Sequence, residues 1–86
     1  MTQSPPRLTV EFLPSAAKDI DSIPAKMAEN ILARIEAYAE GAPSDIKKHK
    51  GRGEFRLRVG DYGVLFVKNG GIAEIHRILH HREAYR

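Results

Sequence analysis

Apolar and polar positions along the chain follow two different periods. Four stretches have the alternating or continuously apolar pattern of strands, namely 8–12, 54–59, 62–68 and 72 to about 79. Gly60 and Asp61 separate the second stretch from the third, and Asn69 and Gly70 separate the third from the fourth. Both pairs are turn sequences, and Asn-Gly is a strong signal for a β-hairpin. The last three strands are therefore expected to follow one another through tight turns.

A helical period occupies the stretch between the first and second strands. Pro14 suits the first turn of a short helix, and Pro24 interrupts that helix and starts a longer one. The apolar residues of the longer helix form one stripe: Met27, Ile31, Ile35 and Tyr38, widened by Ala28, Leu32 and Ala39. We expect this stripe to be buried against a sheet. Gly41 and Pro43 mark the end of the helix.

The order of these elements predicts the fold class. One strand, two helices and three strands indicate an α+β fold, in which a two-helix hairpin covers one face of an antiparallel sheet. The 86 residues suffice for a single domain, spanning 1–86, with a modest core. The composition is that of a globular chain, since 42% of the residues are apolar and 29% are charged.

The sequence shows no signal for a membrane, a leader or a metal. No stretch approaches about 18 consecutive apolar residues, and the N-terminus lacks the basic-then-apolar layout of a secretory signal. The absence of cysteine excludes disulfides and cysteine-ligated zinc, and the histidines and carboxylates have no convincing metal-ligand spacing. We expect a cytoplasmic protein that requires neither a metal nor another cofactor.

Basic residues are concentrated in the second half of the chain. Residues 1–45 contain four basic and seven acidic residues and residues 46–86 contain ten and four, so the halves carry net charges of −3 and +6. The stretch 46–58 alone contains six basic residues: Lys47, Lys48, Lys50, Arg52, Arg56 and Arg58. This separation indicates a polyanionic partner such as RNA or DNA, although a solvated basic face would give the same pattern.

Three blocks of the sequence carry a recognisable motif order: "PSAAKDIDSIP", "IKKHKGRGEFRLRVGDYGVLF" and "HRILHHREAYR". Their most specific parts are the Arg-Leu-Arg-Val-Gly-Asp-Tyr strand-turn-strand and the His-x-Arg-Glu-x-Tyr-Arg ending. In this order, behind a helical pair, the blocks resemble the RelE/ParE toxin superfamily of bacterial toxin–antitoxin systems. The fold of that superfamily matches the α+β arrangement predicted above.

The resemblance implies one of two activities. RelE-like members cut messenger RNA in the ribosomal decoding site without metal, whereas ParE-like members share the fold and inhibit DNA gyrase. Both are held inactive by an antitoxin that wraps the toxin. A third possibility is a degenerate toxin whose remaining role is to bind its antitoxin. The basic strand and the C-terminal motif favour the RelE-like branch, so the expected partners are a cognate antitoxin, the ribosome and messenger RNA, with gyrase as the alternative.

For the RNA-cutting branch, the resemblance implies five working positions: Arg56, Arg58, Gly63, His81 and Tyr85. Arginine stays protonated and its planar fork suits phosphate oxygens, so Arg56 and Arg58 are expected to hold the phosphate. Histidine is the natural group to move a proton near neutral pH, which favours His81 for that role. Tyr85 would orient the substrate, stack on a base or give up a proton. The simpler alternatives are a surface role for His81 and a packing role for Tyr85.

Gly63 departs from the family pattern, which usually has arginine at this position. An arginine there would lie beside Arg56 and Arg58, and glycine removes its charge. A glycine within a strand also costs roughly 1 kcal/mol of stability. Unless Gly63 marks a β-bulge or a close backbone approach, it predicts an attenuated site.

Other basic residues near the predicted site are expected to bind the RNA backbone: Lys47, Lys48, Lys50, Arg52 and Arg82. Arg77 lies in the last predicted strand, next to the expected core, and its simplest role is to pair with a carboxylate.

Overall fold

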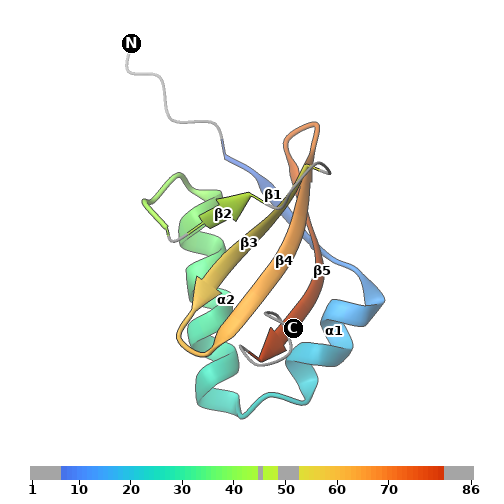
Figure 1. The fold of residues 1–86 in the computed structure, drawn as a ribbon, viewed down its shortest axis with the longest axis vertical. Helices are drawn as coiled ribbons and strands as arrows, with labels where there is room; N and C mark the ends of the chain where they lie inside the picture. Colours follow the sequence, from blue (N-terminus) through green and yellow to red (C-terminus); the bar gives the residue numbers. More distant parts are fainter. Residues whose placement is uncertain (1–6, 45, 49–52, 81–86) are drawn as a thin grey trace.

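The computed structural model describes residues 7–44, 46–48 and 53–80. In chain order they form β1 (Thr9–Phe12), α1 (Pro14–Asp21), α2 (Ala25–Ala39), β2 (Ile46–Lys48), β3 (Glu54–Val59), β4 (Tyr62–Asn69) and β5 (Ile72–His80) (Figure 1). This order confirms the predicted α+β class. The short strand β2 lies in the basic stretch, where no strand is predicted, because three residues are too few to show a period.

The sheet is mixed, whereas the sequence pattern predicts an antiparallel one. Its strand order is β1-β5-β4-β3-β2. The strands from β2 to β5 pair antiparallel, but β1 pairs with β5 in parallel. The chain leaves β1 through the two helices, enters the sheet at the opposite edge and returns strand by strand to β1 (Figure 1). The parallel pairing of β1 with β5 depends on this path of the chain. The hydrophobic period within one strand contains no information about that path.

Proline and glycine define the helix boundaries, as predicted. Pro14 occupies the first turn of α1, where a backbone N–H is not needed. Pro24 is the N-cap of α2 and separates the two helices. Gly41 follows α2 with a φ of 96° and donates its N–H to the Tyr38 carbonyl at 2.9 Å. A positive φ of this kind is readily adopted by glycine, so the helix ends there.

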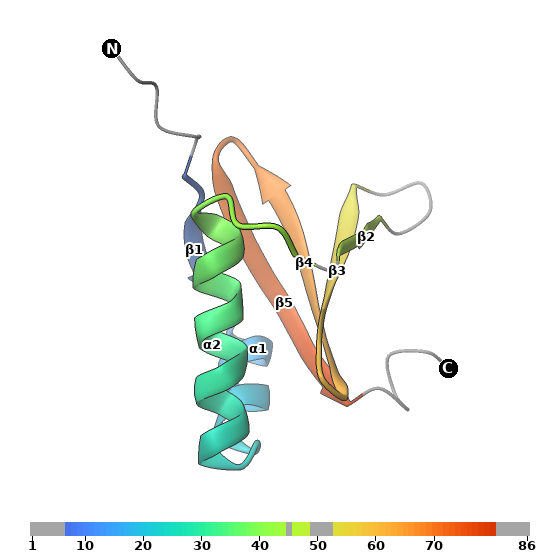
Figure 2. The ribbon, with the colours of Figure 1, turned by 90° about the vertical axis from the view of Figure 1, so that its left-hand side faces the viewer.

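The core lies between the helices and one face of the sheet (Figure 2). Its buried residues are Ala16, Ile31, Ile35, Leu57, Val59, Val64, Phe66, Ala73, Ile75 and Ile78. The ring of Phe66 lies 5.2 Å from that of Tyr38 and 5.6 Å from that of Phe55, measured between centroids. Leu32, which is expected to widen the buried stripe, is instead 37% exposed. The helix therefore packs through a narrower stripe than the sequence suggests.

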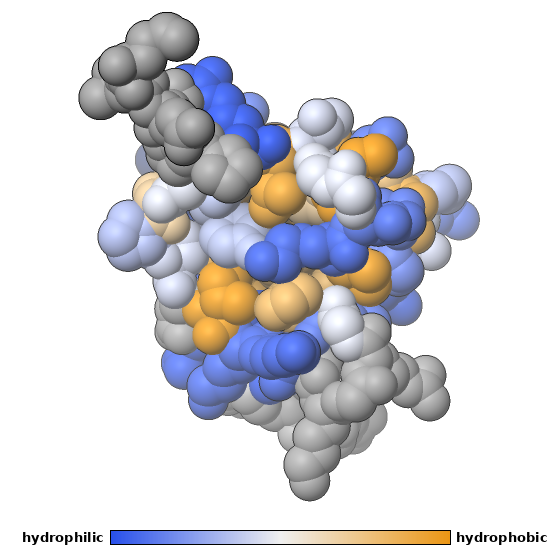
Figure 3. Space-filling model, turned by 90° about the horizontal axis from the view of Figure 1, so that it is seen from above, coloured by the Kyte–Doolittle hydropathy of each residue, from blue (hydrophilic) through white to orange (hydrophobic). Residues whose placement is uncertain are grey.

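Hydrophobic side chains reach the surface in small groups at the end of the molecule that is uppermost in Figure 1. Figure 3 views this end and shows these groups separated by hydrophilic side chains. Burial of apolar surface, which stabilises the fold, is thus concentrated in the layer between helices and sheet.

An irregularity in β5 changes which of its side chains face the core. The register between β4 and β5 shifts after Leu65, and His76 is the extra residue. Ile75 and Ile78 are consequently both buried although they are three residues apart. A β-bulge of this kind turns His76 and Arg77 away from the core.

Candidate nucleic-acid interface

The two arginines of β3 project from the side of the sheet that faces away from the helices. Side chains alternate along a strand, and Leu57 and Val59 are buried in the core. Arg56 and Arg58 therefore lie on the opposite side, as the sequence pattern predicts. We call this side the open face, and its central residues are Lys47, Arg56, Arg58, Gly63, Leu65 and Leu79.

The strand register brings basic residues together across the open face. Lys47 of β2 pairs with Arg56 of β3, Arg56 pairs with Leu65 of β4, and Leu65 pairs with Arg77 of β5. Side chains of paired residues lie next to each other on the same face. Like charges directly opposite each other destabilise a sheet, so the juxtaposition of Lys47 and Arg56 suits a face that binds an anion.

Gly63 lies directly beside Arg58 on the open face. It pairs with Arg58 on one side and with Leu79 on the other, and the register is regular on both sides. The register shift of β4 and β5 lies at Leu65, and Gly63 is not among the glycines with a positive φ. Neither a bulge nor a left-handed backbone therefore requires a glycine here. Gly63 itself is buried.

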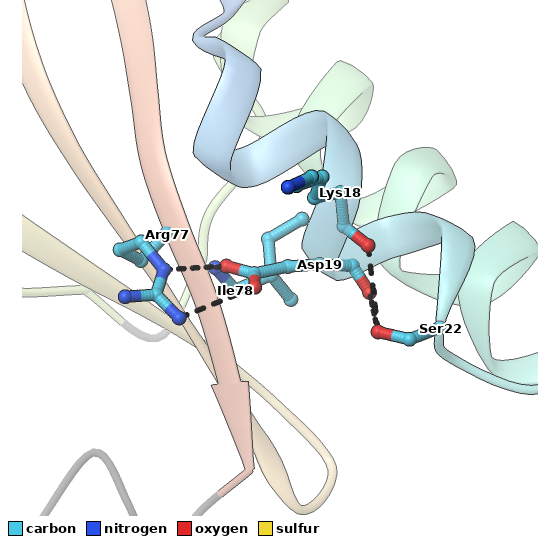
Figure 4. Close-up of polar contacts among 5 residues, drawn as sticks. All are labelled: Lys18, Asp19, Ser22, Arg77 and Ile78. Carbon is cyan, nitrogen blue, oxygen red and sulfur yellow. Dashed lines mark hydrogen bonds and ion pairs between the residues drawn. The ribbon is translucent and has the colours of Figure 1, made fainter.

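Arg77 is bound by a carboxylate of α1 (Figure 4). Its Nε donates to Asp19 Oδ2 at 2.7 Å and its Nη2 donates to Asp19 Oδ1 at 3.2 Å. This two-point contact fits the planar fork of the guanidinium. The expected pairing of Arg77 with a carboxylate is thereby confirmed, and the contact draws its charge toward α1.

Asp19 also completes the hydrogen bonding of β5. The pairing of β1 with β5 ends at Phe12 and Ile75, and beyond this point the Ile78 N–H donates to Asp19 Oδ2 at 2.9 Å. Burial raises the pKa of Asp19. The hydrogen bonds from Arg77 and Ile78 and the positive charge of Arg77 lower the pKa by more, so it lies below the ordinary value of 3.8. Asp19 is therefore an ionised clamp on the end of β5.

Asp19 is not predicted from the sequence, because its partner Arg77 is 58 positions away and no local pattern connects them.

The structure separates two of the lysines predicted to bind RNA. Lys47 pairs with Arg56 and belongs to the open face. Lys48 pairs with Phe55, whose side chain packs against the core, so Lys48 lies on the helix side of the sheet. Both side chains are exposed. The other predicted RNA-binding residues, Lys50, Arg52 and Arg82, lie outside the described residues.

Of the predicted catalytic positions, Arg56, Arg58 and Gly63 are brought together on neighbouring strands. His81 and Tyr85 lie outside the described residues. Within residues 7–44, 46–48 and 53–80, no group of histidines and carboxylates could hold a metal ion. No helix in that same part of the chain is long and apolar enough to cross a membrane.

A cleft of about 370 Å³ lies between α2 and the edge of β3. Its lining residues are Asn30, Arg34, Ser44, Leu57, Arg58, Val59 and Gly60. Arg58 connects this cleft with the open face, because it lines the one and projects from the other. Asn30 and Arg34 are not identified from the sequence, since polar residues one turn apart on a helix look like an ordinary solvated face.

The sequence matches a family model over residues 10–85, and that model describes the ParE toxin of the type II toxin–antitoxin system, parDE. Among curated protein sequences, none matches the chain.

Several solved structures share the fold. A chain of the RelB–RelE antitoxin–toxin complex from Methanococcus jannaschii is 30% identical, with a TM-score of 0.73 over 86% of this chain and 93% of that one. A chain of the archaeal RelE–RelB complex from Pyrococcus horikoshii is 24% identical, with a TM-score of 0.71 over 86% and 94%. A chain of the chromosomal ParDE system of P. aeruginosa is 17% identical, with a TM-score of 0.69 over 85% and 95%. The chain thus belongs to the ParE toxin family of type II toxin–antitoxin systems, within the RelE/ParE superfamily.

Proposed function

We propose that this toxin cuts messenger RNA on the ribosome, as RelE-like members of the superfamily do. The observation that carries the proposal is the cationic open face. There Lys47 of β2 lies opposite Arg56 in the strand register, and Arg58 lies two residues further along β3. Closely spaced cations on one face of a sheet suit the phosphates of an extended strand. The 30% identity to a chain of the RelB–RelE complex supports the same branch.

The chemistry assigns different tasks to the arginines and to the C-terminal residues. Cleavage by the RNA's own 2′-hydroxyl requires a base for that proton, an acid for the leaving 5′-oxygen and cations around the phosphate. Arg56 and Arg58 remain protonated and would hold the phosphate through the transition state. His81 would transfer the proton and Tyr85 would orient or stack on the substrate. The backbone of the RNA would contact Lys47, Lys50, Arg52 and Arg82, whereas Lys48 lies on the helix side of the sheet.

Gly63 predicts a reduced rate in this proposal. The register puts residue 63 next to Arg58, where the superfamily usually has arginine. A missing guanidinium there removes charge stabilisation that is complete only in the transition state. The protein would then be an attenuated nuclease with an intact binding face.

The partner that controls the toxin would be a cognate antitoxin. Solved relatives include complexes described as antitoxin–toxin or toxin–antitoxin complexes, which supports this assignment. The net charge of +6 on residues 46–86, which contain ten basic and four acidic residues, suits an acidic partner segment.

A second candidate function is inhibition of DNA gyrase. It is favoured by the family model, whose description is that of the ParE toxin. In that case the open face would contact a protein, and no phosphate would be cleaved. A degenerate toxin that only binds its antitoxin is the third alternative.

Two assays on the purified protein separate these functions. In the first, ribosomes carrying a defined messenger are incubated with the protein, and cut sites are mapped by primer extension. In the second, gyrase supercoiling of relaxed plasmid is followed. We expect cleavage confined to ribosome-bound messenger, reduced in Arg56→Ala and His81→Ala. Blocked supercoiling with intact messenger would favour the gyrase inhibitor, and inactivity in both assays would favour the degenerate toxin.

A further inference from the structure

The cleft between α2 and β3 is lined by polar side chains whose hydrogen-bonding groups are not used within the described residues. Across residues 7–44, 46–48 and 53–80, the side chains of Asn30, Arg34 and Arg58 form no hydrogen bond or ion pair. The Ser44 hydroxyl donates to the Ala42 carbonyl at 3.1 Å, and its oxygen can still accept. A guanidinium and an amide at the mouth of one cleft are donors suited to an anion.

The charges around the cleft favour a single anionic group over a polyanion. Residues 25–40 carry two basic residues, Lys26 and Arg34, against three acidic ones, Glu29, Glu36 and Glu40, so the helix surface is net negative. A nucleic-acid strand along this helix would bring its successive phosphates close to these carboxylates. One carboxylate that reaches Arg34 avoids that repulsion.

We propose that the α2–β3 cleft binds a carboxylate side chain of an acidic segment of the antitoxin. The inference rests on the proposed function, because it names the chemistry of the antitoxin that controls this toxin. A volume of about 370 Å³ accommodates single side chains but not a helix. The carboxylate would accept hydrogen bonds from Arg34 and Asn30 on α2. Arg58 lies at the rim, so the same contact would place negative charge beside the site proposed to hold RNA.

The site can be tested on the full chain with an acidic peptide as the probe. The ¹⁵N-labelled protein is titrated with an acetylated and amidated Gly-Gly-Glu-Gly-Gly peptide, whose one carboxylate is its only charge, and the backbone amides of Asn30, Arg34 and Gly60 are followed by NMR. We expect saturable shifts at these amides in the millimolar range. Arg34→Glu should weaken binding about tenfold, because it removes a charge-assisted contact and adds repulsion. Arg34→Lys should weaken it less, and Lys26→Glu, on the first turn of the same helix, is the matched control with little effect.

Several results would overturn the proposal. Absence of shifts at the cleft, or equal affinity of Arg34→Glu and the parent, would show that the peptide does not bind there. Displacement of the peptide from the cleft by hexauridylate would assign the cleft to nucleic acid. Peptide binding that appears only in Asp45→Asn would show that the toxin's own carboxylate, next to Ser44 in the sequence, occupies the cleft.

The ribosome assay keeps this test separate from the proposed function. Arg34→Glu should cleave messenger as the parent does, because Arg34 has no role in the proposed chemistry. If the parent protein binds the peptide but cuts no messenger, the proposed nuclease function is contradicted, whereas the proposed carboxylate site in the cleft is not. Loss of cleavage in Arg34→Glu at unchanged melting temperature would contradict the assignment of the cleft to the antitoxin.

Discussion

Two single residues near the end of β5 affect different properties of the sheet. Gly63 leaves the open face without a side chain beside Arg58, in a regular part of the sheet where neither a bulge nor a positive φ requires glycine. Asp19 supplies a carboxylate that binds Arg77 and the Ile78 N–H, where β1 no longer covers the strand. The first residue bears on the chemistry of the face and the second on its stability.

Gly63→Arg is expected to raise cleavage of ribosome-bound messenger by about 10²–10³-fold, because a guanidinium there stabilises charge that develops in the transition state. Gly63→Gln matches most of the added bulk without the charge and should give little gain. Adding His81→Ala to Gly63→Arg should remove most of the increase. The attenuation proposal fails if Gly63→Arg, with the melting temperature of the parent, cleaves no faster than the parent.

Asp19→Asn is expected to lower the free energy of unfolding at neutral pH by about 1–2 kcal/mol, a modest value because Arg77 is half exposed and solvent screens the pair. The pKa of Asp19 is lowered in the fold, so its stabilisation is complete above the ordinary pKa of 3.8 and is lost as the pH falls through the folded pKa. Urea unfolding at several pH values should show the two proteins converging in acid. A difference that stays constant down to the lowest pH would exclude the carboxylate charge as its cause.

At the scale of elements, β2 and α2 determine what each face of the sheet presents. β2 is three residues long, yet its register with β3 puts Lys47 and Lys48 on opposite sides. α2 buries Ile31 and Ile35 against the sheet and leaves Leu32 exposed. The helices therefore cover one face of the sheet, and the other face carries the residues proposed to bind RNA.

Lys47→Glu is expected to weaken RNA or ribosome binding more than Lys48→Glu, although the two lysines are neighbours in the sequence. Lys47 adjoins Arg56 on the open face, whereas Lys48 lies on the helix side. Losing one phosphate contact should reduce the slope of log affinity against log salt by about 1. Binding curves at several salt concentrations test this, and equal effects of the two variants would contradict the assignment of RNA to the open face.

Ile31→Ala is expected to destabilise the protein by about 2–5 kcal/mol, because Ile31 is completely buried and the change leaves a cavity. Leu32→Ala, one residue away on the exposed side, is the matched control and should cost much less. Chemical denaturation gives both values. Comparable losses for the two variants would contradict the observed orientation of α2.

At the scale of the whole molecule, acidic and basic residues are separated along the chain and therefore also in the fold. Residues 1–45, with four basic and seven acidic residues, supply the helices, while residues 46–86, with ten and four, supply β2 to β5. Because the helices cover one face only, the basic half of the chain forms most of the open face (Figure 2). The open face consequently takes its positive charge from the second half of the chain.

Affinity for the cognate antitoxin is expected to fall as salt rises, because part of the attraction between the basic half and an acidic segment is screened. Titration calorimetry of the purified pair at increasing sodium chloride measures this. An affinity that does not change with salt would indicate an interface without an electrostatic contribution.

The sequence by itself determined the elements other than β2 and the direction of the strand side chains, because both depend on neighbouring residues. Period two identified β3 to β5 to within about a residue or two and set Arg56 and Arg58 on one side of β3. Pro14, Pro24 and Gly41 marked the helix boundaries through their own backbone preferences.

Only the tertiary structure decided which distant residues meet. The parallel pairing of β1 with β5, the bulge at His76 and the register that brings Lys47 beside Arg56 arise when the chain returns across the sheet. The bond between Asp19 and Arg77 joins residues 58 positions apart, and the cleft at Arg34 forms between a helix and a strand edge. Such contacts depend on how whole elements pack, and a local period of two or 3.6 residues contains no information about that packing.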